Sequence, residues 1–212
     1  MFKVVFLLFL SPAYAQLDLD KNCNYTDLIT NYTLSTIAGT WYQLERIPNI
    51  LENGDCSTTT FTAILSNGFT EALEFSSREV VNGTLVYRNA YVTFNRTSLG
   101  VLNFTFTDGT SYDYVIRPAK YYEYESLVLY SCQNNGNGSS VLAWKLGKNL
   151  TQSPEAKNAT EKIIASINDL TNATWRTTSF SDAACKNDAG EHLHAGMAFY
   201  KLLVALALVK GY

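Results

Sequence analysis

Histidine is almost absent from this chain, and its scarcity removes whole classes of chemistry. The 212 residues include two histidines, His192 and His194, and both follow the last cysteine, Cys185. The preceding segment therefore has no imidazole for haem ligation, general acid–base catalysis or a nucleophilic triad. No phosphate-binding glycine loop, G-x-S-x-G motif or H-E-x-x-H motif occurs either. We expect a protein that is not an enzyme and that uses no cofactor.

The sequence also lacks signals for a metal site and for nucleic acid. His192 and His194 have no supporting cluster of cysteines or carboxylates, so we interpret them as part of a solvated spacer. The 16 basic residues form no run, and the formal net charge is −3. This balance argues against a nucleic acid as partner.

The first 15 residues have the pattern of a secretory signal. Lys3 gives a basic start, residues 4–10 are apolar, and Ala13 and Ala15 are small residues two positions apart. A buried N-terminal helix would need more length and a polar face. We expect cleavage after Ala15 and a single mature domain over residues 16–187.

The cysteines and the N-glycosylation sequons fit a secreted chain. The four cysteines are Cys23, Cys56, Cys132 and Cys185, and no two are spaced as C-x-x-C. Two disulfides are therefore predicted, with three pairings open on spacing alone. Nine N-x-S/T sequons predict a heavily glycosylated surface. Their asparagines are Asn24, Asn31, Asn82, Asn95, Asn103, Asn137, Asn149, Asn158 and Asn172.

Eight segments between residues 40 and 148 are rich in β-branched and aromatic residues and are separated by turn signals. Asn67-Gly68, Asn82-Gly83 and Asp108-Gly109 favour tight hairpin turns. Consecutive hairpins without helical crossovers indicate an all-β, antiparallel up-and-down sheet, and eight such strands close into a barrel. The expected strands are Thr40–Ile47, Ser57–Leu65, Phe69–Arg78, Thr84–Phe94, Val101–Thr107, Tyr112–Ile116, Ser126–Cys132 and Val141–Lys148.

Two sequons predict which side of the strands faces inward. A glycosylated asparagine must point to solvent, so Asn103 and Asn95 belong to the outer face. Because side chains alternate along a strand, their apolar neighbours face the interior. These neighbours are Leu102, Phe104 and Phe106 on one strand and Val92 and Phe94 on the other.

One amphipathic helix is expected after the last strand, over about residues 154–170. Ser153 is a suitable N-cap, and Pro154 and Glu155 are typical of a first helical turn. Apolar residues at 163, 164, 167 and 170 form one stripe, while Asn158 lies off it. We expect this helix to pack against the outside of the barrel.

Five short motifs occur along the predicted strands. They are Gly39-Thr40-Trp41-Tyr42, Arg46-Ile47-Pro48, Glu52-Asn53-Gly54-Asp55-Cys56, Leu129-Tyr130-Ser131-Cys132 and Ala143-Trp144-Lys145-Leu146. Together they resemble the lipocalin family, in its branch of apolipoprotein D and the insect bilin-binding proteins. The resemblance covers nearly all of the expected domain and implies a barrel that holds a small apolar ligand.

The resemblance also implies structural roles for particular residues. It pairs the first cysteine with the third and the second with the fourth, which gives Cys23–Cys132 and Cys56–Cys185. It places Trp41 of the Gly39-x-Trp41 motif at the barrel floor, where Lys148 replaces the arginine that covers this ring in the family. A second departure concerns the family's T-D-Y motif, which falls near residues 121–123, where its aspartate is missing or shifted.

Aromatic and leucine side chains on the predicted strands are the candidates for contact with the ligand. They could equally fill a closed core, and for a generic eight-stranded barrel these two interpretations are about even. The resemblance favours a ligand cavity. The candidates are Phe61, Phe94, Leu102, Phe104, Tyr114, Leu129, Leu142 and Trp144.

The C-terminal tail resembles the signal for a glycosylphosphatidylinositol (GPI) anchor. Residues 195–209 are apolar apart from Lys201, which is short for a transmembrane helix. Small residues beginning at Asn187 and a polar spacer precede them, as in GPI signals. We expect the anchor at Asn187 and removal of residues 188–212, although a retained tail or a weak span stays open. Heavy glycosylation together with an anchor resembles the Lazarillo group of insect lipocalins.

The sequence thus predicts an extracellular binder of a small apolar ligand of the lipid, retinoid, fatty-acid or bilin class, held at the plasma membrane. The Lazarillo resemblance implies a role at the surface of cells such as neurons. One alternative is a soluble carrier of biliverdin or lipid. Another is a surface protein whose outer face contacts another protein, with the cavity incidental.

Overall fold

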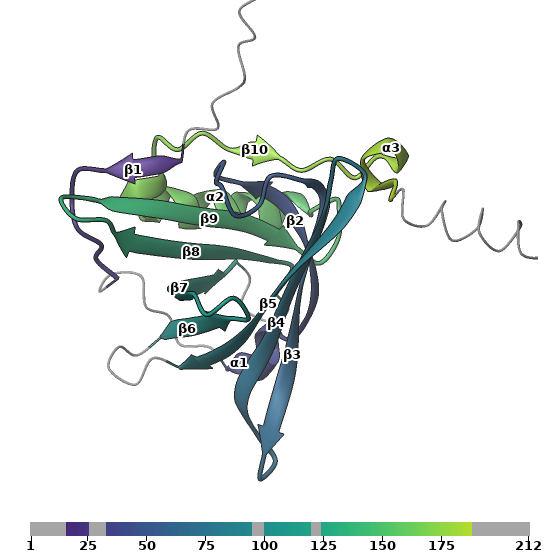
Figure 1. Cartoon of the computed structure of the whole chain (residues 1–212), viewed down its shortest axis with the longest axis horizontal. Helices are drawn as coiled ribbons and strands as arrows, with labels where there is room; N and C mark the ends of the chain where they lie inside the picture. Colours follow the sequence, from purple (N-terminus) through teal and green to yellow (C-terminus); the bar gives the residue numbers. More distant parts are fainter. Residues whose placement is uncertain (1–15, 26–32, 95–99, 120–123, 188–212) are drawn as a thin grey trace, which may run out of the picture.

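The fold is a closed antiparallel barrel with a helix packed on its outside (Figure 1). The computed structural model describes residues 16–25, 33–94, 100–119 and 124–187. The signal segment, Asn31, Asn95, residues 121–123 and the tail after residue 187 therefore lie outside the described residues.

Eight consecutive strands form the barrel, each paired with the next, and β9 pairs with β2 to close it. The expected eight-stranded up-and-down barrel is confirmed, and the strand ends differ from expectation by at most three residues. Short strands β1, Leu17–Leu19, and β10, Arg176–Thr177, extend the sheet beside β9 and β2. The barrel strands are β2 Gly39–Arg46, β3 Asp55–Ser66, β4 Phe69–Val81, β5 Thr84–Phe94, β6 Val101–Phe106, β7 Ser111–Pro118, β8 Ser126–Asn134 and β9 Ser139–Gly147.

Two hairpins turn at the Asn-Gly pairs that the sequence singled out. Asn67 and Gly68, and likewise Asn82 and Gly83, all have positive φ. This is the geometry of the type I′ turn, whose twist matches that of the flanking strands. The β3–β4 hairpin is long and projects beyond the other strands (Figure 1).

The C-terminal helix is shorter than expected. Helix α2, Pro154–Ser166, is capped by the Ser153 hydroxyl, which accepts a hydrogen bond from the Ala156 amide at 3.2 Å. It stops because Ile167 adopts an extended conformation, and the 3₁₀ turn η2, Asn168–Leu170, follows. The apolar stripe still covers the outer face of β8 and β9, as the sequence predicted. Within the described residues, no helix is long and apolar enough to cross a membrane.

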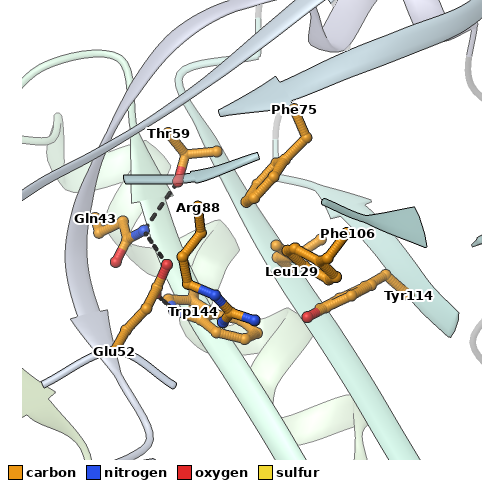
Figure 2. A pocket seen from close by; sticks show the side chains of 9 residues that line it. All are labelled: Gln43, Glu52, Thr59, Phe75, Arg88, Phe106, Tyr114, Leu129 and Trp144. Atoms are coloured by element: carbon orange, nitrogen blue, oxygen red, sulfur yellow. Dashed lines mark hydrogen bonds between the residues drawn. The ribbon is translucent and has the colours of Figure 1, made fainter. Parts of the chain in front are cut away.

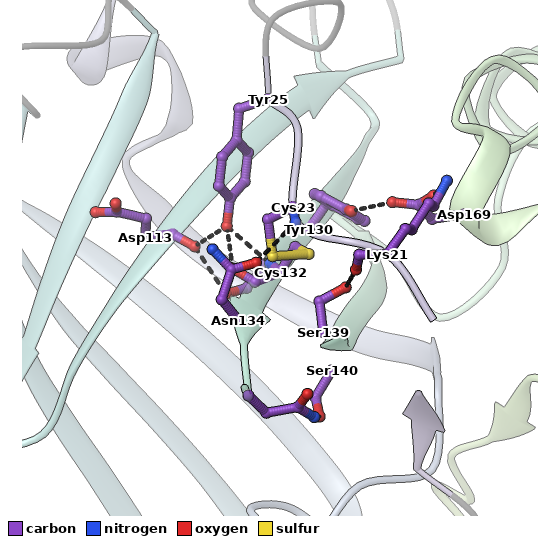
Figure 3. Close-up of a disulfide and its surroundings, with 12 residues drawn as sticks. Lys21, Cys23, Tyr25, Asp113, Tyr130, Cys132, Asn134, Ser139, Ser140 and Asp169 are labelled. Atoms are coloured by element: carbon purple, nitrogen blue, oxygen red, sulfur yellow. Dashed lines mark hydrogen bonds and ion pairs between the residues drawn. A yellow bond between two sulfur atoms is a disulfide. The ribbon is translucent and has the colours of Figure 1, made fainter. Parts of the chain in front are cut away.

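The first disulfide joins the N-terminal segment to strand β8. Cys23 is bonded to Cys132, and the Cys23 amide donates to the Asn134 side chain at 2.8 Å. Beside them the Tyr25 hydroxyl donates to the Cys132 carbonyl at 2.6 Å and accepts from its amide at 2.8 Å (Figure 3). The segment that precedes the barrel is thus fastened along β8.

The second disulfide joins Cys56, at the start of β3, to Cys185, the last residue of the short helix α3, Asp182–Cys185. The Cys56 amide also donates to the Ser179 carbonyl at 2.8 Å. Both pairings are the ones that the resemblance implies. The C-terminal segment therefore reaches the described end of the chain beside the open end of the barrel, where β2 ends and β3 begins.

The seven sequon asparagines among the described residues lie on the outside of the barrel. Asn103 is half-buried, because its amide donates to the Asp113 carboxylate at 3.1 Å while its carbonyl accepts from Thr105 and Ser111. The other six described sequon asparagines are exposed. They are Asn24, Asn82, Asn137, Asn149, Asn158 and Asn172.

Candidate ligand-binding site

The closed end of the barrel is built around Trp41. Its ring is fully buried, its indole N–H donates to the Ile37 carbonyl at 2.9 Å, and Ile37 ends the short helix α1, Leu34–Ile37. The Lys148 ammonium lies 3.8 Å from the ring centroid, so the lysine covers the tryptophan as a cation on a π face. Burial lowers the pKa of Lys148.

Gly39 allows this approach. Its φ is +109°, a region that favours glycine, and an added Cβ would lie 3.0 Å from Lys148 Nζ. The Gly39-x-Trp41 motif therefore forms the floor, and Lys148 takes the place that the resemblance implies for it.

Above the floor, six aromatic side chains form a continuous group that we call the aromatic wall. Phe104 is central, with ring centroids 4.3 Å from Tyr114 and 5.2 Å from Phe75. Such tilted and edge-to-face contacts add to the stabilisation from burial. The wall consists of Phe61, Phe75, Phe104, Phe106, Tyr114 and Trp144.

The opposite part of the interior is polar, and we call it the polar corner. It combines inward side chains near the upper ends of β2, β3 and β4 with one carboxylate from the loop between β2 and β3. All of its members are buried. They are Gln43, Arg46, Glu52, Ser57, Thr59, Ser77 and Glu79.

The loop of residues 47–54, which we call the mouth loop, brings Glu52 into the barrel. Asn49 shapes the loop, because its side-chain oxygen accepts from the amides of Leu51 and Glu52, each at 2.9 Å. Its amide group donates to the Ile47 carbonyl at 3.0 Å. This local turn directs Glu52 inward, while Ile50 stays exposed.

Glu52 is held in the interior by neutral donors. Its carboxylate accepts from the Trp144 indole at 2.6 Å, from the Ser77 hydroxyl at 2.7 Å and from the Gln43 amide at 3.4 Å. Gln43 also donates to Thr59 at 2.9 Å. Glu52 thus connects the mouth loop to the aromatic wall through Trp144.

Arg46 and Glu79 form the second half of the polar corner. The fully buried Arg46 guanidinium lies 3.4 Å from Glu79 and donates to Ser57 and to the Gly54 carbonyl. Glu79 accepts from the amides of Asn53 and Gly54 at 3.2 and 2.7 Å. Burial, and secondly the charge of Glu52, raises the pKa of Glu79, whereas burial lowers the pKa of Arg46.

Little free space remains between the aromatic wall and the polar corner. The cavity there has about 10 Å³, close to the room that one water molecule needs. Figure 2 shows polar side chains on one side, rings on the other, and Arg88 and Trp144 between them. The cavity is lined by Gln43, Glu52, Thr59, Phe75, Arg88, Phe106, Tyr114, Leu129 and Trp144.

A larger hollow of about 190 Å³ lies beside the mouth loop, and we call it the vestibule. Tyr112 and Leu142, which contribute to it, are the inward neighbours of Tyr114 and Trp144 on β7 and β9. The vestibule therefore lies next to the cavity, on the side of the open end. Its lining is Gln16, Ile50, Leu51, Tyr112, Gln133, Asn134, Asn135, Ser140 and Leu142.

The residues that the sequence suggested as ligand contacts are divided among the cavity, the vestibule and the surrounding core. Tyr114, Leu129 and Trp144 line the cavity, and Leu142 lines the vestibule. Three others, Phe61, Leu102 and Phe104, are buried in the same core without lining either space.

Phe94 was placed wrongly as an interior residue. Its side chain is 43% exposed, although Val92, Leu102, Phe104 and Phe106 are buried as expected. The β4–β5 ladder ends at the Leu73–Val92 pair, so Phe94 has a neighbouring strand on one side only. Alternation correctly assigned Phe94 to the inward-facing side of β5, but it could not show that this position lies beyond the end of the β4–β5 pairing.

Several lining residues had not been singled out as ligand contacts. Phe75 follows Leu73 with the alternation of an inner face, and Phe106 was expected inside, so pattern alone could have identified both. Arg88, Gln43 and Glu52 give no such signal, because polar residues are normally assigned to the outside.

No protein-family model matches the sequence, and no curated protein matches it. Solved structures do match. Insecticyanin from the tobacco hornworm Manduca sexta is 18% identical with a TM-score of 0.68, and the match covers 82% of this chain and 94% of that one. Lobster apocrustacyanin A1 is 16% identical with a TM-score of 0.63, covering 80% and 94%. H1 crustacyanin from the lobster Homarus americanus is 18% identical with a TM-score of 0.58, covering 74% and 81%.

The chain has the lipocalin fold. At these identities the matches establish the architecture, and the contacts described above have to carry the argument about function.

Proposed function

We propose that this protein is an extracellular lipocalin that binds a small apolar ligand inside its barrel and carries out no reaction. The observation that carries the proposal is the buried aromatic wall, which adjoins a vestibule at the open end of the barrel. Aromatic lining with a few placed polar groups is typical of small-molecule sites. The two disulfides fit an oxidising compartment.

Ligand binding requires the interior to open further. Pockets for small ligands usually have about 300–1,000 Å³, whereas the cavity and the vestibule have about 10 and 190 Å³. The mouth loop holds Glu52 against Trp144, and both line the cavity, while Ile50 and Leu51 of the same loop line the vestibule. Outward movement of this loop and rotation of the neighbouring rings would join the two spaces. A conformational cost of this kind lowers the apparent affinity.

Binding of a hydrocarbon fluorophore tests the proposal. Diphenylhexatriene has no polar group and fluoresces strongly only when it leaves water. We expect saturable binding to the glycosylated mature protein, and we expect Leu142→Trp, which fills the vestibule, to abolish it. The matched control is Leu65→Trp on the exposed β3–β4 hairpin, which should bind like the wild type. Equal binding by both variants would place the ligand elsewhere.

The proposal includes a lipid anchor at Asn187. Cys185 is bonded to Cys56, so processing that preserves this disulfide must occur after residue 185. Asn187 follows two residues later and is itself followed by small residues and a polar spacer. A surface role like that of the Lazarillo group depends on this anchor. The soluble carrier is the form that the protein would take without it.

Phospholipase treatment separates these two forms. Insect cells that express the full chain should release the protein on addition of phosphatidylinositol-specific phospholipase C. A chain that stops after Asn187 is the control, and it should be secreted without the enzyme. Secretion of the full chain with Tyr212 attached, or membrane association that resists the enzyme, would contradict the anchor and favour the soluble carrier.

A further inference from the structure

We propose that Glu52 selects apolar ligands that end in a hydrogen-bond donor, an amine or an alcohol, over ligands that end in a carboxylate. This inference rests on the proposed function, because it concerns the polar end of a molecule held by the same barrel. Three observations support this inference. They are the position of the Glu52 carboxylate, the balance of charge around it, and the capacity of this carboxylate to accept further hydrogen bonds.

The first observation is where the carboxylate lies. Glu52 is 5% exposed, yet it lines the cavity together with Tyr114, Leu129 and Trp144. Glu52 belongs to the mouth loop, in which the side chain of Ile50 points to solvent, yet the side chain of Glu52 points into the barrel. Burial of a carboxylate is costly unless hydrogen bonds compensate it. A ligand that displaces rings of the aromatic wall would therefore meet a partly desolvated negative charge.

The second observation is an excess of negative charge in the polar corner. One buried guanidinium, Arg46, interacts with two buried carboxylates, Glu52 and Glu79, and with the Arg176–Asp55 ion pair, whose two charges cancel. Arg46 is in direct contact with Glu79, while the hydrogen bonds that Glu52 accepts from the described residues come from neutral side chains. When both carboxylates are ionised, one positive and two negative groups leave one unbalanced negative charge beside the cavity.

Arg88, which also lines the cavity, does not neutralise the negative charge of the polar corner. Its guanidinium is stacked 4.5 Å above the Phe106 ring and is half-buried, so water screens it more than the polar corner is screened. It also interacts with Asp108 in the β6–β7 turn, whose carboxylate is solvent-exposed.

The third observation is unused acceptor capacity. An ionised carboxylate has about four lone-pair sites for hydrogen bonds. The described residues provide three donors to Glu52, and the Gln43 contact is long at 3.4 Å. An N–H or O–H group on a ligand could therefore bind Glu52 without displacing Trp144 or Ser77. A ligand carboxylate would bring a like charge and no donor.

The test compares three ten-carbon ligands that differ only in their polar end. Decylamine, 1-decanol and decanoate would displace diphenylhexatriene from the wild-type protein at pH 7, where the amine is protonated and the acid is ionised. Hydrogen bonds to charged groups lead us to expect half-displacement by the amine and the alcohol at about tenfold lower concentration than by decanoate.

Two variants locate the cause of this preference. Glu52→Gln removes the charge with little change of shape and should reduce the difference between amine and acid to about threefold or less. Glu74→Gln, on the exposed face of β4, removes a charge outside the barrel and should leave the difference unchanged. If Glu52→Gln does not fold, as judged by circular dichroism, the ranking of the three ligands on the wild type decides alone.

The outcomes separate this inference from the proposed function. If the fluorophore binds and decanoate displaces it as well as decylamine does, the selection by Glu52 is wrong and ligand binding stands. A preference that persists in Glu52→Gln would overturn the inference as well. If the fluorophore does not bind to the wild-type protein, both proposals fail.

Discussion

The aromatic wall and the polar corner share one barrel interior but are stabilised in different ways. In the wall, Phe104 contacts four other rings, and its stabilisation comes from apolar burial and close packing. In the corner, Arg46 and Glu79 are also buried, but their stabilisation comes from hydrogen bonds and from the ion pair between them. Removal of a group therefore leaves a void in the wall, and a polar atom without its partner in the corner.

This difference in stabilisation suggests that the aromatic wall and the polar corner contribute differently to ligand binding. Rings can rotate and still exchange one apolar contact for another, so the wall suits ligands of varied shape. Polar groups are selective, because a buried donor or acceptor without a partner costs about 1–3 kcal/mol. We infer that the wall supplies affinity and the corner supplies selectivity.

The largest effect should follow from a void in the wall. Phe104→Ala removes a fully buried ring and should lower the free energy of unfolding by about 3–5 kcal/mol. Phe94→Ala is the matched control on the neighbouring strand, and because its ring is 43% exposed its cost should stay below about 1 kcal/mol. Urea unfolding with both disulfides intact measures the two free energies of unfolding. Equal losses in the two variants would contradict the claim that Phe104 is a core residue and Phe94 is not.

A smaller effect is expected where the wall meets the corner. Trp144→Phe keeps a ring but removes the indole N–H that Glu52 accepts at 2.6 Å, so unfolding should become easier by about 1–3 kcal/mol. Trp175→Phe is the comparison, since Trp175 packs on the outside, under Lys145. The contact with Glu52 would be unimportant if Trp144→Phe cost no more than Trp175→Phe.

The smallest effect concerns pH and the corner alone. Burial raises the pKa of Glu79 above its usual value of 4.5, so the folded state binds this proton more tightly than the unfolded chain does. The stability linked to Glu79 is therefore full below pH 4.5 and is lost as pH rises through the raised pKa.

Glu79→Gln removes this titration. The stability of the wild type relative to Glu79→Gln should therefore decrease from pH 4 towards neutral pH, whereas the same series for Phe104→Leu should show no such trend. Thermal unfolding across the pH range measures both. A relative stability of Glu79→Gln that does not change with pH would show that Glu79 does not titrate as described.

The two regions also differ in what the sequence predicts. Alternation along β6 identified Phe104 and Phe106 of the wall, because a period of two places both on one face together with Leu102. It could not locate Phe94 at the barrel's edge, since that depends on where the neighbouring strand stops pairing.

The corner was beyond pattern analysis. Glu52 comes from a loop without periodicity, and its inward direction depends on the Asn49 turn and on donors from three different strands. The near absence of free space was also unexpected. Composition predicts which residues are inside, but not how completely their rings fill the interior.

The most direct test of the central claim uses the three tryptophan indole N–H groups as reporters. Trp41 lies at the floor, Trp175 on the outer face, and Trp144 in the aromatic wall, where it contacts Glu52 of the polar corner. A ¹⁵N–¹H spectrum of the mature protein, with the Trp144 signal assigned from Trp144→Phe, would be titrated with 1-decanol. Binding inside the barrel should shift the Trp144 signal saturably and leave that of Trp175 in place. An unchanged Trp144 signal, or a shift at Trp175 alone, would contradict ligand binding inside the barrel.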